Sequence, residues 1–244
     1  MRTTAARGVR GGRAGHTAGH QHAGALVLSA CLPPKAAPPP PSTAPLAPAP
    51  ARLTVFPGPT GPVATPPWWK GDCDSTDNPG SHPLGASYRG VELCGPRPSA
   101  DHTPDVLVRF FNGAWGEQEW ECVELAMRFM YLAYGVSPYG ANGKDVYANY
   151  TTAAGGGLVK IADGTPGSPP APGDVITFGA APSTPLGHVG VVESVTMDVN
   201  GNGSIRILSQ NDTTDGWRTL SVHNWSVDGT TAGVGPTVGW LHKP

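Results

Sequence analysis

The clearest pattern along the chain is one apolar segment without helix breakers, followed by several short β-prone runs. Residues 120–134 (WECVELAMRFMYLAY) contain no Gly or Pro, and apolar side chains fall on nearly every side of a helix drawn through them. Gly135 follows directly. This pattern predicts a buried helix that ends at Gly135. A second, shorter helix is expected near Asp145–Tyr150.

The β-prone runs set the fold class. One run precedes the helix and five follow it: 106–111, 174–178, 188–196, 204–211, 217–225 and 238–241. Residues 200–203 (NGNG) are two Asn-Gly pairs, which are a strong hairpin signal. Helices first and strands second predict an α+β fold, with N-terminal helices packed on an antiparallel sheet of about five or six strands.

Composition divides the chain before this pattern begins. Of its 28 prolines, 14 fall within residues 32–67, a stretch also rich in Ala. Such a sequence buries too little apolar surface to offset its ordering entropy, so a disordered, extended spacer is expected there. We expect residues 68–104 to be a loop-rich lead-in and residues 105–244 to form the folded domain.

The first 31 residues have the order of an export signal. Four arginines and no acidic residue precede the short apolar patch at 23–30, and Cys31 follows. Residues 28–31 (LSAC) resemble a bacterial lipoprotein box, in which the Cys is lipidated. The expected location is therefore extracytoplasmic, either secreted or tethered to a membrane through Cys31. The alternative is a disordered tail in which Cys31 is a stray thiol.

Charge and ligand patterns exclude several classes. The formal net charge of −2 argues against a nucleic-acid binder, which carries a basic excess. No run of 18 apolar residues is present, so no transmembrane helix is expected. No Cys or His spacing matches a zinc site. Residues 198–203 (DVNGNG) match half of a calcium loop, but a hairpin turn is the better interpretation. No cofactor or metal is expected.

The four cysteines fit an exported protein. Cys73 and Cys94 flank a Gly/Pro/Ser-rich stretch, and a loop of that size is usefully stabilised by a disulfide. If these two pair and Cys31 is lipidated, Cys122 remains as a single free thiol. That leftover thiol requires an explanation.

Cys122 has the position of a nucleophile. It falls in the first turn of the predicted helix, where N–H groups and the helix dipole are expected to lower the pKa of a thiol. His188 opens a predicted strand and is a candidate base, and Asn211 ends the next one and is a candidate to orient the imidazole. Trp115 and Trp120 are close enough in sequence to line a cleft beside Cys122.

Each of these residues also has a structural interpretation. A Cys in an apolar helix is commonly inert packing, and a single His at a strand start is commonly structural. Asn211 is also compatible with a simple turn. The three residues together, in the secondary-structure positions that a thiol hydrolase needs, favour the chemical interpretation.

The surrounding motifs resemble those of the CHAP family (cysteine, histidine-dependent amidohydrolase/peptidase). The resemblance runs over residues 106–244 and rests on the segments 121–125 (ECVEL), 172–178 (PGDVITF), 187–192 (GHVGVV), 209–211 (SQN) and 239–242 (GWLH). It implies a papain-like α+β fold and cleavage of amide bonds, typically in peptidoglycan. It also implies that Cys122 is the nucleophile and that His188 is the general base and later the general acid.

Two positions depart from the family pattern. Glu121 stands where the family often has Gln, and its negative charge would oppose thiolate formation. Ser209 stands where a carboxylate usually orients the His, which leaves that role to Asn211. Asp212 is a candidate substitute carboxylate, but if the strand continues to this residue, alternation points it to the opposite side from Asn211.

The sequence therefore predicts a monomeric, cysteine-dependent peptidoglycan hydrolase without a cofactor. It leaves open whether the enzyme is an N-acetylmuramoyl-L-alanine amidase or an endopeptidase. An export signal argues against the family's glutathionylspermidine amidases, whose substrate is cytosolic. The alternative is a noncatalytic wall-binding or adhesive module, which the departures at Glu121 and Ser209 favour.

Overall fold

The computed structural model describes residues 52–69, 73, 81–96, 107–108, 117–118 and 120–244. The expected export signal with Cys31, most of the expected spacer, and Trp115 lie outside these ranges. Among the described residues, no helix combines the length and the apolar character that crossing a membrane requires.

The helices fall where the sequence predicts them. Helix α1 (Cys122–Tyr134) ends at Gly135, whose φ of 70° is left-handed and therefore suits glycine. The short helix expected near 145–150 is a 3₁₀ turn, η1 (Gly143–Asp145), that continues into α2 (Val146–Asn149). A further 3₁₀ turn, η2 (Thr152–Ala154), follows.

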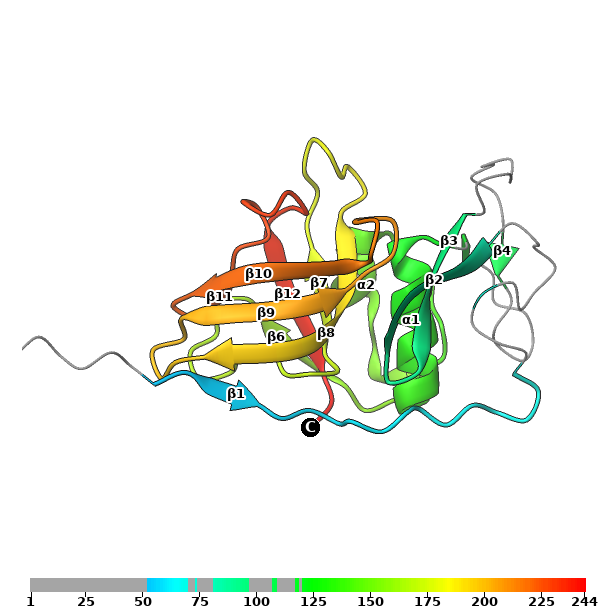
Figure 1. Ribbon diagram of the computed structural model, residues 1–244, viewed down its shortest axis with the longest axis horizontal. Helices are drawn as coiled ribbons and strands as arrows, with labels where there is room; N and C mark the ends of the chain where they lie inside the picture. Colours follow the sequence, from blue (N-terminus) through cyan, green and yellow to red (C-terminus); the bar gives the residue numbers. More distant parts are fainter. Residues whose placement is uncertain (1–51, 70–72, 74–80, 97–106, 109–116, 119) are drawn as a thin grey trace, which may run out of the picture. The chain divides into compact units, whose positions relative to one another are not determined.

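Most strands belong to one antiparallel sheet, so the α+β class is confirmed (Figure 1). Its path runs β11-β10-β9-β8-β7-β12-β6, and β1 pairs with β8 beside that path. The strands are β1 (Thr54–Phe56), β6 (Val159–Ala162), β7 (Val175–Phe178), β8 (His188–Met197), β9 (Gly203–Leu208), β10 (Trp217–His223), β11 (Ser226–Val227) and β12 (Thr237–His242). Two separate pairs are β2 (Ser81–Tyr88) with β3 (Val91–Pro96), and β4 (Leu107–Val108) with β5 (Glu117–Gln118).

The sheet has eight strands, so the expected number of five or six is too low. The extra strands are short, and they lack the alternation that marks a longer strand. Strand β1 comes from residues that we expected to belong to the spacer, and Val55 pairs with Thr196 of β8. Its pairing partner is far away in the chain, which local sequence does not reveal.

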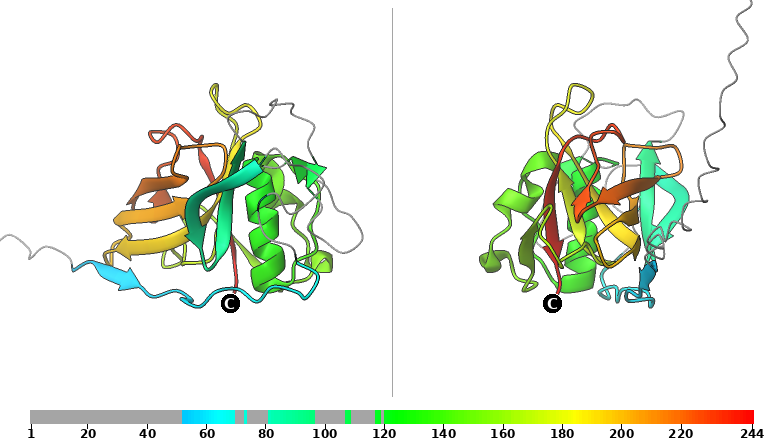
Figure 2. Two further views of the ribbon diagram at one scale, coloured as in Figure 1. Left: turned by 45° about the vertical axis from the view of Figure 1, so that its right-hand side comes forward. Right: turned by 90° about the vertical axis from the view of Figure 1, so that its left-hand side faces the viewer.

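Helix α1 carries the first residue of the site and is buried against β8. Leu125, Ala126 and Phe129 of α1 share one apolar cluster with Val189 and Val191 of β8. The β2–β3 hairpin lies beside α1, as two views show (Figures 1 and 2). The start of α1, the start of β8 and the hairpin are therefore held close together.

Candidate functional site

The structure places Cys122 and His188 in the same region. Cys122 is the first residue of α1 and is 7% exposed. Cys122 shares a buried cluster with Val189, the residue directly after His188, and the backbone N–H of Val189 acts to lower the pKa of the thiol. The packing of α1 on β8 therefore brings the candidate nucleophile to the candidate base.

His188 is set by the turn that precedes β8. Gly187 has φ 72°, and a Cβ there would lie 2.5 Å from the backbone oxygen of Phe178, so only glycine fits. The imidazole of His188 stacks on the ring of Phe178, with centroids 6.3 Å apart. His188 is 4% exposed, so the ring has little freedom to turn.

The expectation of a lowered pKa for Cys122 is wrong. Burial raises the pKa of the thiol to about 12, and the negative charge of Glu121 adds to the rise. Backbone N–H groups of Val189, Val123 and Cys122 itself act in the opposite direction but are outweighed. The sulfur is therefore a neutral thiol at neutral pH, and reaction requires a base.

His188 is suited to be that base in its neutral form. Burial lowers the pKa of the imidazole, and Arg218 acts in the same direction, while Asp212 opposes them. The Nε2 atom of His188 lies 3.8 Å from Oδ2 of Asp212. That distance exceeds a hydrogen bond, and Nε2 has no hydrogen-bond partner within the part of the chain that the structure describes.

Asp212 is a fixed carboxylate beside His188. Arg218 donates to it from Nε at 2.7 Å and also from Nη2, and the hydroxyl of Ser209 donates at 3.2 Å. Burial alone would raise the pKa of Asp212, but these donors and the nearby positive charges lower it overall. Asp212 is therefore ionised at neutral pH.

The expected direction of Asp212 assumed that the strand continues, but β9 ends before it reaches this residue. The strand stops at Leu208, and Asn211 has a left-handed φ of 54°. Alternation of side chains therefore no longer applies at Asp212. The sequence signal for this turn is weak, although Asn tolerates a left-handed backbone better than most residues.

Asn211 contacts the residue before the candidate nucleophile. Its Nδ2 lies 3.2 Å from each carboxylate oxygen of Glu121. The turn after β9 thus points the Asn211 amide at Glu121. The predicted role of Asn211 in orienting the imidazole stays a prediction.

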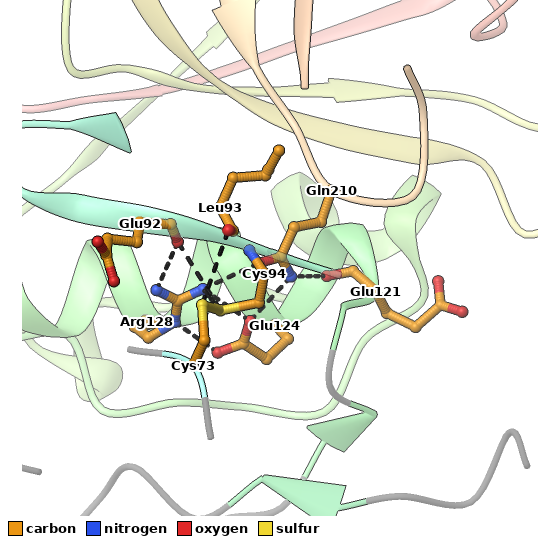
Figure 3. The surroundings of a disulfide bond; sticks show 8 residues. All are labelled: Cys73, Glu92, Leu93, Cys94, Glu121, Glu124, Arg128 and Gln210. Carbon is orange, nitrogen blue, oxygen red and sulfur yellow. Dashed lines mark hydrogen bonds and ion pairs between the residues drawn. A yellow bond between two sulfur atoms is a disulfide. The ribbon is translucent and has the colours of Figure 1, made fainter. Parts of the chain in front are cut away.

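A buried polar network fixes the two segments that carry these residues (Figure 3). Gln210 donates from Nε2 to the carbonyl of Glu121 and to Glu124, each at 2.9 Å. Its Oε1 accepts from the N–H of Cys94 at 2.8 Å and from Arg128 at 3.0 Å. Arg128 in turn forms a two-pronged ion pair with Glu124, at 2.6 and 2.9 Å. The network ties the start of α1 to the turn that holds Asp212.

The sequence analysis did not identify Gln210, Glu124, Arg128 or Arg218 as residues that hold the site. Glu124 and Arg128 are spaced i,i+4, but such pairs are usually on the surface. Here both side chains are fully buried. Burial of this pair depends on the β2–β3 hairpin covering α1, which no local pattern indicates.

The disulfide expected between Cys73 and Cys94 is present. It joins the described residue Cys73 to strand β3, and Arg128 reaches the sulfur of Cys94 at 3.5 Å (Figure 3). Cys122 is the one free cysteine among the described residues. The hairpin is thus cross-linked at the point where it meets the network.

The half calcium loop is a turn, as the sequence favours. Asp198 accepts from the N–H groups of Asn200 and Asn202 at 2.9 and 2.8 Å, which closes the link between β8 and β9. Among the described residues, no group of three or more His, Cys, Asp or Glu side chains is arranged to hold a metal ion.

These features define a class of site: a buried thiol at a helix N-terminus beside an imidazole at the start of an antiparallel strand. Comparison with protein families assigns the class, because residues 112–211 match the CHAP domain. This segment is a CHAP domain, so the resemblance inferred from the sequence is confirmed over residues 112–211, and the segment 239–242 lies outside the match. CHAP domains are in general hydrolases that act on amide bonds, and peptidoglycan is their associated substrate. No curated protein matches the chain.

Proposed function

We propose that this protein is a cysteine-dependent peptidoglycan hydrolase with Cys122 as nucleophile and His188 as base. The observation that supports the proposal is the packing of Cys122 in one buried cluster with Val189, the residue directly after His188. The family match to residues 112–211 supports an amide bond as the target. A papain-like fold is part of the same proposal.

The reaction begins with a neutral thiol and a neutral imidazole. The Cys122 sulfur attacks the carbonyl carbon of the scissile amide while its proton moves to His188. The oxyanion accepts a hydrogen bond from the backbone N–H of Cys122, which lies at the N-terminus of α1. His188 then protonates the leaving amine, and a thioester with Cys122 remains.

Water completes the reaction. His188, neutral again, takes a proton from the attacking water, and the thioester breaks to a carboxylic acid and the Cys122 thiol. The net change is hydrolysis of one amide to one acid and one amine. Asp212 stabilises the imidazolium in each half of the reaction, since it is ionised and 3.8 Å from Nε2.

Asp212 supplies, from a different place in the chain, the carboxylate that is missing at position 209. The hydroxyl of Ser209 donates a hydrogen bond to Asp212. Ser209, which stands where the family usually has a carboxylate, therefore acts on His188 through Asp212. Asp212 is a positioning residue in this scheme, whereas Asn211 interacts with Glu121.

The second candidate is a wall-binding module that has lost catalysis. It is favoured by the pKa of Cys122, which burial raises to about 12, and by Ser209 in place of a carboxylate. A noncatalytic module does not need Asp212 beside His188, yet an ion pair with Arg218 holds Asp212 there. We therefore favour the enzyme.

Export remains part of the proposal. We propose that the chain acts outside the cytoplasm, secreted or tethered through Cys31, because its substrate is there and because residues 1–31 have the order of an export signal. The Pro/Ala-rich residues that follow would hold the domain away from the membrane.

The test follows release of new amino groups from purified peptidoglycan by the full chain. Wild type should release amines, while Cys122→Ala and His188→Ala should not. Asp212→Asn should lower kcat by about 100-fold with KM unchanged and should shift the acid limb of the pH profile, because the imidazolium loses its counter-charge. Asn211→Ala tests the competing assignment in the same turn and should lower activity less than Asp212→Asn, whereas Glu193→Gln, which removes a carboxylate paired with Arg206, is the control and should match wild type.

Two outcomes contradict parts of this scheme. No amine release by the wild type, with normal binding to peptidoglycan, would establish the noncatalytic module. A large loss in Asn211→Ala with little effect in Asp212→Asn would return the orienting role to Asn211, as the sequence alone suggested.

A further inference from the structure

A cavity of about 420 Å³ is lined by Asp212, which lies 3.8 Å from His188, and by Trp120, which precedes Cys122 by two residues. One wall is the turn after β9, with Asp212, Thr213 and Thr214. Trp120, two residues before Cys122, contributes a second wall. The cavity therefore borders both the carboxylate beside His188 and the segment that leads into the nucleophile. Its volume suits a small molecule or one ring of a larger one.

The third wall comes from outside the family match. Leu84 of β2 and Gly95 of β3 line the cavity, and both precede residue 112, where the match to the CHAP domain begins. A Cβ at Gly95 would lie 2.7 Å from Leu84, so the glycine lets the leucine side chain settle over the strand. This chain thus adds the β2–β3 hairpin to the site.

The added wall is rigid where it meets the site. The disulfide holds Cys94 next to Gly95, and the Cys94 N–H donates to Gln210, which adjoins the turn that carries Asp212. Both sides of the cavity are therefore anchored to the same buried network. Because the walls of the cavity are already ordered, their side chains and loops lose little conformational entropy when a ligand binds.

Trp120 is held in an unfavourable backbone conformation. Its φ of 56° is left-handed, which is uncommon for a bulky residue. Such strain occurs mainly at functional sites. Here it accompanies an indole that lines the cavity and is only partly buried.

The wall chemistry selects a neutral, hydroxyl-bearing ligand. Among the described residues that line the cavity, Asp212 is the only charged one, and Arg218 already pairs with it. The remaining walls offer an indole, an aliphatic side chain, the hydroxyls of two threonines, the Asn211 amide, and Cys94 and Gly95 of β3. A sugar ring matches this set, since its apolar face stacks on an indole and its rim carries hydroxyls.

We propose that this cavity binds an N-acetylated sugar ring, so that the amide cut by Cys122 is the one next to the sugar rather than one within the peptides. The inference rests on the proposed function. The indole of Trp120 stacks on the ring, Leu84 covers the acetyl methyl, and the turn at Thr213 and Thr214 faces the polar rim. The β2–β3 hairpin is then the element that gives this chain its preference.

Two readouts test the cavity, one with catalysis and one without. The first compares amine release from N-acetylmuramoyl-L-alanyl-D-isoglutamine and from a sugar-free stem tetrapeptide. The second measures binding of N-acetylglucosamine by NMR titration of the full chain carrying Cys122→Ala. Trp120→Gly removes the ring and also relieves the backbone, and Leu84→Ala trims the hairpin wall. Leu53→Ala, at an exposed position just before β1, is the matched control.

We expect wild type to cleave the sugar-bearing fragment and to leave the tetrapeptide intact. Trp120→Gly should lower kcat/KM for that fragment by about tenfold, and Leu84→Ala should lower it severalfold. Both should weaken binding of N-acetylglucosamine, and Leu53→Ala should change neither. Faster cleavage of the tetrapeptide, or no effect of the two cavity variants, would overturn the inference.

The outcomes separate the cavity from the catalytic proposal. If neither fragment is cleaved but N-acetylglucosamine binds and Trp120→Gly abolishes the binding, the sugar site stands and the hydrolase proposal fails. If the tetrapeptide alone is cleaved, the hydrolase stands and the sugar site fails. If neither cleavage nor binding occurs, both are wrong.

Discussion

At the scale of single residues, Cys122 is subject to opposing effects from its neighbours. Backbone N–H groups at the helix start favour the thiolate, while burial and the Glu121 carboxylate favour the thiol. Burial and the Glu121 charge outweigh the N–H groups, so the pKa of the thiol is raised. Asn211, whose amide donates to Glu121, holds that carboxylate in place. Glu121 therefore limits how readily the thiol ionises.

Neutralising this carboxylate should make the thiol more reactive. Glu121→Gln removes the charge but keeps an oxygen for Asn211, so the pKa of Cys122 should fall and alkylation by iodoacetamide at pH 8 should speed up, by at most about tenfold. The measurement is the alkylation rate across about pH 7–10. Glu193→Gln, which removes a carboxylate paired with Arg206, is the control and should match wild type. An unchanged rate in Glu121→Gln would show that burial alone sets the pKa.

At the scale of elements, the site depends on contacts between α1, the β2–β3 hairpin and the turn after β9. The ion pair of Glu124 with Arg128 is fully buried and is completed by Gln210 and by the carbonyl of Glu92. A buried pair of this kind contributes less to stability than to defining one arrangement of its elements. Breaking it, however, leaves a buried charge without a partner.

Removal of one partner should therefore be costly. Arg128→Met should lower the free energy of unfolding by about 3–5 kcal/mol, whereas the double variant Glu124→Leu/Arg128→Met should recover much of that loss. Urea denaturation of both proteins gives the comparison. Arg206→Met breaks a half-exposed pair with Glu193 at 3.7 Å and should cost less than about 1 kcal/mol. Equal losses in the two single variants would contradict the importance of burial.

At the scale of the whole domain, the loop before β7 is joined to the end of β12 by a hydrogen-bonded contact between Asp174 and His242. Oδ1 of Asp174 lies 2.8 Å from Nδ1 of His242, and Oδ2 accepts a hydrogen bond from the backbone N–H of Ala171. Burial raises the pKa of Asp174 to about 6, although Ala171 and His242 act in the opposite direction. The folded domain thus keeps a proton on Asp174 at a pH where the unfolded chain has lost it.

This shift has a definite sign. A raised pKa in the folded state means that the stabilisation is present below about pH 4 and is lost as pH rises to about 6. Asp174→Asn removes the titration, so stability of the variant relative to wild type should rise across this window, by up to about 1.4 kcal/mol per pH unit, and level off above it. Urea unfolding at pH 4, 5, 6 and 7 measures it. A constant difference across the series would contradict the raised pKa.

Local sequence determines much of this protein, because its main signals act over a few residues. Periodicity predicts helix α1, which ends at Gly135, and the strands from β7 to β10. Turn chemistry predicts the turn at 200–203, and cysteine spacing predicts the disulfide. The motifs around Cys122 and His188 are likewise local, and they suffice to identify the CHAP domain.

Tertiary structure decides what depends on residues far apart in the chain. Three features join distant segments. They are the pairing of β1 with β8, the burial of Glu124 and Arg128 under the hairpin, and the approach of Asp212 to His188. The pKa of Cys122 follows the same rule, since a helix N-terminus lowers it locally but burial by the assembled fold raises it more. Local pattern indicates the proposed reacting groups, and packing sets the charge and the partners of these side chains.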